Sequence, residues 1–225
     1  MSGAAPLQSP LQLRDAVELL YRTRRDEDVV VSSMGSAREW MALGPLHERD
    51  LVLVPSAMGH ATSLGLGLAL AQPERRVIVL SGDGSLMMNL GTLVTISAQA
   101  PVNLIVVVFV NGVYEVTGAQ PTPGAPAARA ERDAVDIGAI ARGCGLRSVF
   151  EWHTMEAMRE GLSAALHAPG PTLVVLDVAP VPGAVGPRSP GPTKERVERL
   201  KAALRSGREA GTAGGRREAG GGRRG

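Results

Sequence analysis

Two polar side chains follow apolar runs in positions where they could hold a metal ion. Asp83 stands between glycines in SGDGS after RVIVL, and Asn111 precedes a glycine after NLIVVVFV. Runs of this kind are typical of buried central strands, and ligands collect at the carboxyl ends of such strands in open parallel sheets. A carboxylate, an amide oxygen and a backbone carbonyl form a hard oxygen set that suits Mg²⁺ together with phosphate oxygens.

The glycines around Asp83 favour a phosphate ligand. Gly82 and Gly84 let the backbone turn tightly, and a helix beginning there aims free N–H groups at whatever binds. The plainer interpretations are that Asp83 only caps the next helix and that Asn111 only belongs to an Asn-Gly turn. Ligation of a metal and its diphosphate is favoured by the family resemblance described below, which includes the pattern N..Y..TG.Q that begins at Asn111.

The elements that must position these residues follow from hydrophobic periodicity. Apolar runs alternate with amphipathic stretches from about Asp28 to Ala179, which predicts an α/β fold: a doubly wound, mostly parallel six-stranded sheet with helices on both faces. The predicted strands are 28–33, 50–55, 76–82, 103–111, 147–151 and 172–178. The predicted helices are one in LQLRDAVELLYRTRR and others at 36–43, 59–71, 87–99, 134–143 and 154–167.

The chain divides into one domain and a C-terminal extension. We expect the domain to span residues 1–180, and a Pro/Gly linker with a C-terminal helix, capped by Thr193, to span 181–205. The Gly/Arg-rich segment 206–225 lacks apolar side chains to bury, so it is predicted to be disordered.

Composition limits the classes of protein that the chain could represent. Its 225 residues, 44% hydrophobic, suffice for a compact domain with a core, and the net charge is only +2. The basic excess gathers after Lys201, so a nucleic-acid-binding face is not expected. The single Cys144 excludes an internal disulfide and a cysteine-based metal or iron–sulfur site. No apolar run is long enough to span a bilayer and no secretory signal is visible, which predicts a cytoplasmic protein that does not enter membranes.

The segment GDGSLMMNLGTLVTIS and the pattern N..Y..TG.Q together resemble the thiamine-diphosphate-binding motif. The resemblance is most specific to the sulfopyruvate and phosphonopyruvate decarboxylase group and covers about residues 28–180. It also extends over SSMGSAREW, PSAMGHATSLGLGLAL, MNLGTLVTIS, NGVYEVTGAQPT and VDIGAIARGCGL.

The resemblance implies a role for each residue that matches the motif. Asp83, the Asn111 side chain and the Val113 carbonyl would bind Mg²⁺, and Met58 would lie under thiamine diphosphate and hold it in a folded V shape. The diphosphate would be contacted by Gly59, His60, Gly82, Gly84 and Ser85. One departure is Val110, because many relatives have Asn before the ligand Asn.

The resemblance further implies that this chain is the cofactor-binding subunit of a 2-oxo acid decarboxylase that depends on thiamine diphosphate and Mg²⁺. The chain is most like the β subunit of sulfopyruvate decarboxylase. In that group a glutamate from a pyrimidine-binding domain completes the site. After the six predicted strands no second domain of that size fits, so the glutamate is expected from a separate partner chain in a hetero-oligomer, and the substrate is a small anionic 2-oxo acid.

Several alternatives remain open at this point. The chain could resemble phosphonopyruvate decarboxylase, the thiamine subunit of a 2-oxo acid oxidoreductase, or a non-catalytic scaffold of the same fold. The oxidoreductase is disfavoured because the chain has no cysteine set for an iron–sulfur cluster. A nicotinamide-binding domain would need GxGxxG after the first strand, which SSMGSA does not supply. The sequence does not assign the substrate, the partner, the oligomer stoichiometry or the roles of Arg38, Glu115 and the C-terminal tail.

Overall fold

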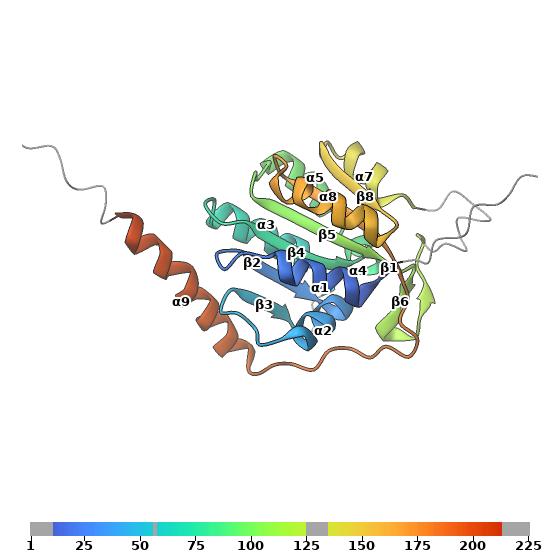
Figure 1. Ribbon diagram of the computed structural model, residues 1–225, viewed down its shortest axis with the longest axis horizontal. Helices are drawn as coiled ribbons and strands as arrows, with labels where there is room; N and C mark the ends of the chain where they lie inside the picture. Colours follow the sequence, from blue (N-terminus) through green and yellow to red (C-terminus); the bar gives the residue numbers. More distant parts are fainter. Residues whose placement is uncertain (1–10, 56–57, 125–134, 213–225) are drawn as a thin grey trace, which may run out of the picture.

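The computed structural model describes residues 11–55, 58–124 and 135–212. Figure 1 shows a central sheet with helices on both of its faces. The strands of the main sheet are β1 (Leu11–Gln12), β2 (Val29–Ser33), β3 (Asp50–Leu53), β4 (Val77–Gly82), β5 (Leu104–Val110), β8 (Ser148–Trp152) and β9 (Thr172–Ala179). The helices are α1 (Leu13–Thr23), α2 (Met34–Leu43), α3 (Ala61–Ala71), α4 (Asp83–Met87), α5 (Gly91–Gln99), α7 (Ile137–Gly143), α8 (Met155–His167) and α9 (Thr193–Thr212).

The main sheet is parallel, and its order is β1-β9-β5-β4-β2-β3, with β8 also beside β9. All six predicted strands are present, and the two-residue β1 joins β9 as an addition that the sequence did not predict. β4 and β5 are neighbours, with Gly82 opposite Phe109. The residues that follow these strands therefore meet at one edge of the sheet, as predicted for Asp83 and Asn111.

Two cores sandwich the sheet, and their composition explains the layers. Every residue of β5 is buried, because helices cover this central strand on both sides. Side chains of α3, α5, α7 and α9 pack against one face, and side chains of α1, α2 and α8 pack against the other. Both tryptophans, Trp40 and Trp152, are buried in the second core, which agrees with a packing role.

The helix predicted at 87–99 is instead two helices. α4 begins directly at Asp83, and α5 begins at Gly91 after a short turn. The turn places Asn89 so that its Nδ2 donates to the Gly59 carbonyl at 3.0 Å and to Ser63 Oγ at 3.1 Å. These contacts come from a distant part of the chain, so periodicity alone could not locate the break.

The C-terminal helix runs from Thr193 through Thr212, so Thr193, predicted to cap the helix, is its first residue. It continues past Arg205, so residues 206–212, expected to be part of a disordered tail, are helical; residues 213–225 lie outside the described part of the chain. Extending an existing helix fixes only one further residue for each new hydrogen bond. A helix can therefore continue beyond its last buried apolar residue. Leu200 and Leu204 are buried against the core beside β3.

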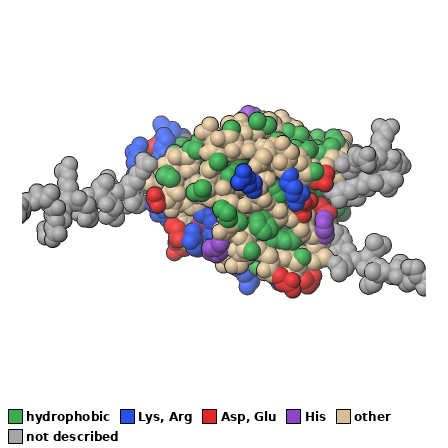
Figure 2. All heavy atoms as spheres, turned by 90° about the horizontal axis from the view of Figure 1, so that it is seen from above, with side chains coloured by type: hydrophobic (Ala, Val, Ile, Leu, Met, Phe, Trp, Pro, Cys, Tyr) green, Lys and Arg blue, Asp and Glu red, His purple; other side chains and the backbone are tan. Residues whose placement is uncertain are grey.

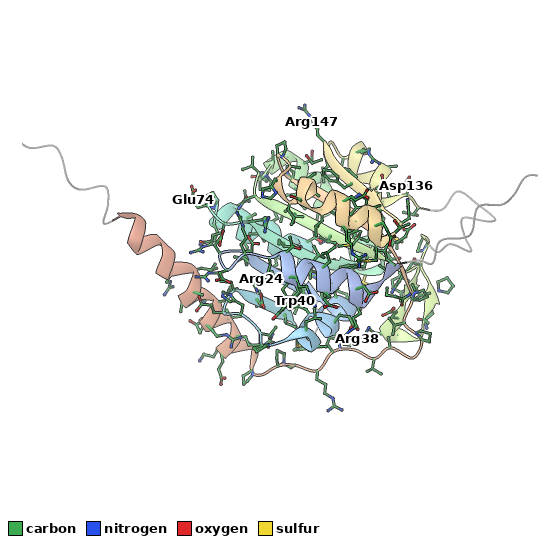
Figure 3. The ribbon with its side chains drawn as sticks, in the orientation of Figure 1. Arg24, Arg38, Trp40, Glu74, Asp136 and Arg147 are labelled. Atoms are coloured by element: carbon green, nitrogen blue, oxygen red, sulfur yellow. The ribbon has the colours of Figure 1, made fainter. Side chains whose placement is uncertain are left out.

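Buried ion pairs lie where strands β2, β3 and β4 begin. Arg24 Nη1 lies 2.5 Å from Asp50 Oδ1, and Trp40 Nε1 donates to Asp50 Oδ2 at 3.0 Å (Figure 3). Arg76 pairs with Asp28 in a similar buried contact. Each of these charges is matched inside the fold, so the pairs have a structural role.

Charged side chains are spread over the face of the molecule that Figure 2 shows. On the face shown in Figure 2, Lys and Arg side chains lie in separate small groups rather than in one continuous basic surface. No helix within the described residues has the length and apolar character needed to cross a bilayer.

Candidate cofactor site

The site is centred on Asp83, the first residue of α4. Its side chain is 1% exposed, and its Oδ2 accepts hydrogen bonds from Thr122 Oγ1 at 2.9 Å and from the Gly112 backbone N–H at 3.2 Å. The loop after β5 thus reaches back to the carboxylate that follows β4. This contact joins the two polar positions singled out in the sequence.

Asp83 is a buried carboxyl group that has no matching positive charge among the residues that the structure describes. Burial raises its pKa, against the opposing effect of the hydrogen bonds from Thr122, Gly84, Gly112 and Asn111. Among the described residues no Lys, Arg or His forms an ion pair with it. A carboxylate in this position would be stabilised by a cation, because an opposite charge favours the ionised form.

Asn111 and Val113, the other two predicted ligands, line the same cavity as Asp83. Asn111 Oδ1 accepts a hydrogen bond from the Val113 N–H at 3.0 Å, which closes a tight turn around Gly112, at φ 73°. Val113 then begins the short strand β6 (Val113–Tyr114), which pairs with β7 (Gln120–Pro121). The 3-10 helix η1 (Glu115–Thr117) connects them and forms part of the wall of the site.

The loop that carries Met58, Gly59 and His60 is fastened to the helix start of α4. The Gly59 N–H donates to Ser85 Oγ at 3.0 Å, and Gly59 has φ 82°, a left-handed conformation that favours glycine. His60 is exposed, and its Nδ1 lies 3.0 Å from the Met58 carbonyl oxygen. Its side chain makes no capping hydrogen bond to α3.

A cavity of about 70 Å³ joins these segments. Of the residues predicted from the sequence, Met58, Gly82, Asp83, Gly84, Ser85, Asn111 and Val113 line it. Gly59 and His60 are not among its lining residues, although both lie on the adjoining loop. Gly84 must remain small, since an added Cβ would lie 2.6 Å from Tyr114 Cε1.

Several residues of the site were not singled out from the sequence, and three of them show why. Thr122 binds Asp83, Asn89 binds the Gly59 carbonyl, and Met34 lines the cavity with φ 52°. Thr122 lies within the segment NGVYEVTGAQPT, but nothing in that segment shows its hydroxyl directed at Asp83. A positive φ at a methionine leaves no trace in the sequence.

The residues present fit a Mg²⁺–diphosphate group. The donor set mixes one carboxylate with amide and backbone oxygens, and the described residues contain no group of three or more His, Cys, Asp or Glu side chains that could hold a metal by themselves. Mg²⁺ usually takes one or two protein carboxylates and fills its shell with water and substrate phosphates. The unmatched carboxylate of Asp83 therefore suits a cation that brings its own anionic ligand.

Comparison with known proteins agrees with this geometry. Residues 33–176 match the C-terminal TPP-binding domain of thiamine pyrophosphate enzymes. The chain is 40% identical over 172 residues to a phosphonopyruvate decarboxylase of Streptomyces viridochromogenes, covering 76% of this chain and 40% of that protein. It is also 40% identical over 139 residues to sulfopyruvate decarboxylase subunit beta of Methanothermobacter thermautotrophicus, covering 62% of this chain and 69% of that subunit.

A solved structure confirms the fold. The Rhodococcus jostii thiamine diphosphate-dependent 4-hydroxybenzoylformate decarboxylase superposes with a TM-score of 0.63 at 22% identity, over 80% of this chain and 34% of that one. The chain spans about two fifths of the phosphonopyruvate decarboxylases it matches, 40% and 39% of their lengths. Its sequence match and its fold together show that the chain belongs to the thiamine pyrophosphate enzyme family, as a C-terminal TPP-binding domain.

Proposed function

We propose that this chain is the cofactor-binding subunit of a thiamine-diphosphate- and Mg²⁺-dependent 2-oxo acid decarboxylase, most like the sulfopyruvate decarboxylase β subunit. The proposal is carried by the buried carboxylate of Asp83, which lies beside Asn111 and forms no ion pair within the described part of the chain. Asp83, the Asn111 side chain and the Val113 carbonyl bind the metal. Thiamine diphosphate, once bound, supplies an electron sink for the electrons left behind when CO₂ departs.

The remaining residues of the site orient and shield the cofactor. Gly82, Gly84 and Ser85 leave room at the start of α4 for the diphosphate, and Gly59 and His60 approach it from the loop that Ser85 Oγ fastens. Met58 lies in the cavity wall and is the apolar support for the folded cofactor. Thr122 and the Gly112 N–H hold the Asp83 carboxylate in one orientation, so that the metal meets a fixed oxygen.

A separate partner chain completes the site. The relatives named as β subunits are parts of an enzyme with more than one kind of subunit, and they match this chain over most of their length: 69% and 71% of each. In the proposed assembly the partner contributes a pyrimidine-binding domain and the catalytic glutamate. The assembly is therefore a hetero-oligomer that acts on a small anionic 2-oxo acid.

Exposed apolar side chains on α3, on α5 and in the turn between α4 and α5 support such a partner. Residues 84–114 contain no Asp, Glu, Lys or Arg, although α4 and α5 lie on the outside of the sheet. Leu64, Leu70, Met88 and Val94 are 37%, 49%, 50% and 57% exposed, and Met88 also lines the cavity. Loss of charged residues is typical of the buried centre of a protein–protein interface.

The first experiment measures cofactor binding by calorimetry with and without Mg²⁺. Asp83→Ala is expected to abolish Mg²⁺-dependent binding of thiamine diphosphate while leaving the fold intact, because the carboxylate is a ligand and has no ion-pair partner within the described residues. Asp15→Ala, which removes an exposed carboxylate on α1, is the matched control and should bind as the wild type does. Equal affinity in both variants would contradict the metal assignment.

The second part of the experiment assays decarboxylation of sulfopyruvate, phosphonopyruvate and pyruvate. The chain alone should be inactive, and activity should appear when the candidate partner is added. Turnover by the lone chain at about 1 s⁻¹ or faster would refute the need for a partner.

A further inference from the structure

The chain continues well beyond the family domain and folds back onto it. The family match ends at residue 176, and β9 ends at Ala179. From there residues 180–192, here called the strap, run past η1 and α2 to the start of α9 at the far side of the sheet (Figure 1). The strap and α9 together contact a residue that lines the cofactor cavity and the end of β3, the strand that precedes the loop carrying Met58.

The first contact joins the strap to the cavity wall. The Val181 N–H donates to Glu115 Oε1 at 2.8 Å, and Glu115 is one of the residues that line the cavity. Glu115 begins η1, two residues after Val113. A bond to this side chain therefore fixes the loop that supplies the proposed metal ligands Asn111 and Val113.

The second contact holds the strap over α2. Arg38 Nη1 donates to the Val185 carbonyl at 3.3 Å, while its Nε donates to Glu39 Oε1 at 2.9 Å. Figure 3 shows Arg38 on the side of α2 along which the strap passes. The strap is thus attached at both Glu115 and Arg38 before it reaches α9.

The third contact lies at β3, which is the last strand in the order of the main sheet within the described residues. The Arg196 guanidinium, in a residue that is 8% exposed, donates to the backbone carbonyls of Val52 and Val54. It also donates to the Gly191 carbonyl and to Thr193 Oγ1, both at 3.2 Å. These partners of the guanidinium are all neutral oxygens. The pKa of Arg196 is lowered mainly by burial and to a smaller extent by the positive charge of Arg199.

The carbonyls that Arg196 binds lie at the end of β3 and in the residue that follows it, shortly before Met58 in the sequence. Val54 is four residues before Met58, and Gly59 follows, fastened to α4 through Ser85. An arginine can hold two carbonyls in one plane, because its donors form a rigid fork. The guanidinium therefore fixes the direction in which the chain leaves β3.

We infer that the strap and α9 hold both cofactor loops in their binding conformation, and that Arg196 is a positioning residue for the loop that carries Met58, Gly59 and His60. The inference rests on the proposed function, since it concerns the same site. It assigns a role to a segment outside the matched family domain. Arg196 acts through the β3 backbone and does not touch the cofactor cavity.

The test compares Arg196→Met with Arg199→Met in the full chain. Arg199 is exposed on the same helix and serves as the control for losing a positive charge from α9. Affinity for thiamine diphosphate with Mg²⁺ should fall about tenfold in Arg196→Met, because the apparent Kd rises in proportion as the fraction of molecules with an ordered loop falls to a tenth. Arg199→Met should bind as the wild type does.

Hydrogen exchange of the cofactor-free chain gives a second, independent measurement. Backbone amides of residues 58–60 should exchange about tenfold faster in Arg196→Met, while amides of the central strand β5 should keep their wild-type rates. Arg196→Lys, which keeps the charge but cannot fork across two carbonyls, should fold and lie between the wild type and Arg196→Met in both measurements. This variant decides the question if Arg196→Met does not fold.

The outcomes separate this inference from the proposed function. If the wild type does not bind thiamine diphosphate, the proposed function fails, and hydrogen exchange alone decides whether Arg196 orders the loop. If the wild type binds, equal affinity and equal exchange rates in the wild type, Arg196→Lys and Arg196→Met overturn the inference. A uniform rise in exchange that includes β5 would also overturn it, since it would indicate a general loss of stability.

Discussion

Replacing Gly84 with alanine tests whether the cavity depends on the close approach of α4 to Tyr114. An alanine Cβ would lie 2.6 Å from Tyr114 Cε1 and 2.7 Å from Cδ1, well inside ordinary contact distance. The ring must move, and it belongs to the residue that follows Val113. Gly91→Ala is the matched control, because no atom lies within 4 Å of its added Cβ.

The size of the effect follows from two opposing terms. Forcing an extra methyl group against a packed ring costs about 1–3 kcal/mol, and alanine regains about 1 kcal/mol through its better helix propensity. The net loss of about 0–2 kcal/mol corresponds to a fall in Tm of up to about 8 °C for a chain of this length. Gly91→Ala should melt at or slightly above the wild-type temperature.

The functional effect should be larger than the effect on stability. Moving Tyr114 shifts the Val113 carbonyl and the turn that presents Asn111, so affinity for thiamine diphosphate with Mg²⁺ should fall more than tenfold. Calorimetric titration at 20 °C, far below the melting transition, measures this separately from unfolding. Wild-type affinity together with wild-type Tm in Gly84→Ala would refute the assignment of this contact.

Two further predictions concern the core and the buried acid. Gly65→Ala should destabilise the fold by about 1–3 kcal/mol, since its Cβ would lie 2.1 Å from a Val79 methyl carbon. Gly67→Ala on the same helix meets no atom within 4 Å and should stabilise the fold by up to about 1 kcal/mol. Thermal melts in which both variants shift Tm in the same direction would contradict this prediction. Burial raises the pKa of the Asp83 carboxyl group in the metal-free folded protein. The protonated carboxyl group therefore contributes stability that is fully present below about pH 4. This contribution is lost as the pH rises through the pKa of the folded state. At pH 7 without Mg²⁺, Asp83→Asn should therefore melt at or above the melting temperature of the wild type. If the difference in Tm between the two proteins does not shrink as the pH falls toward 4, ionisation of the Asp83 carboxyl group is not its cause.

The sequence was sufficient to predict the sheet and the location of the site. The buried strands β4 and β5 can be recognised in the sequence by their long apolar runs, because a strand covered on both faces needs apolar side chains on both sides. Parallel strands place their carboxyl ends at one edge, so Asp83 and Asn111 were predicted to meet. The structure brings them together through the bond from the Gly112 N–H to Asp83.

Other features depend on contacts between distant segments and could not be predicted from local pattern. The break between α4 and α5 serves a hydrogen bond from Asn89 to Gly59, and the partner of Asp83 is a hydroxyl at Thr122, far along the chain. Arg196 appeared in the sequence as one of several charges on a C-terminal helix. Only the tertiary structure places its guanidinium against the open edge of β3, because an edge strand leaves carbonyls unpaired and a buried cation must find oxygens to bind.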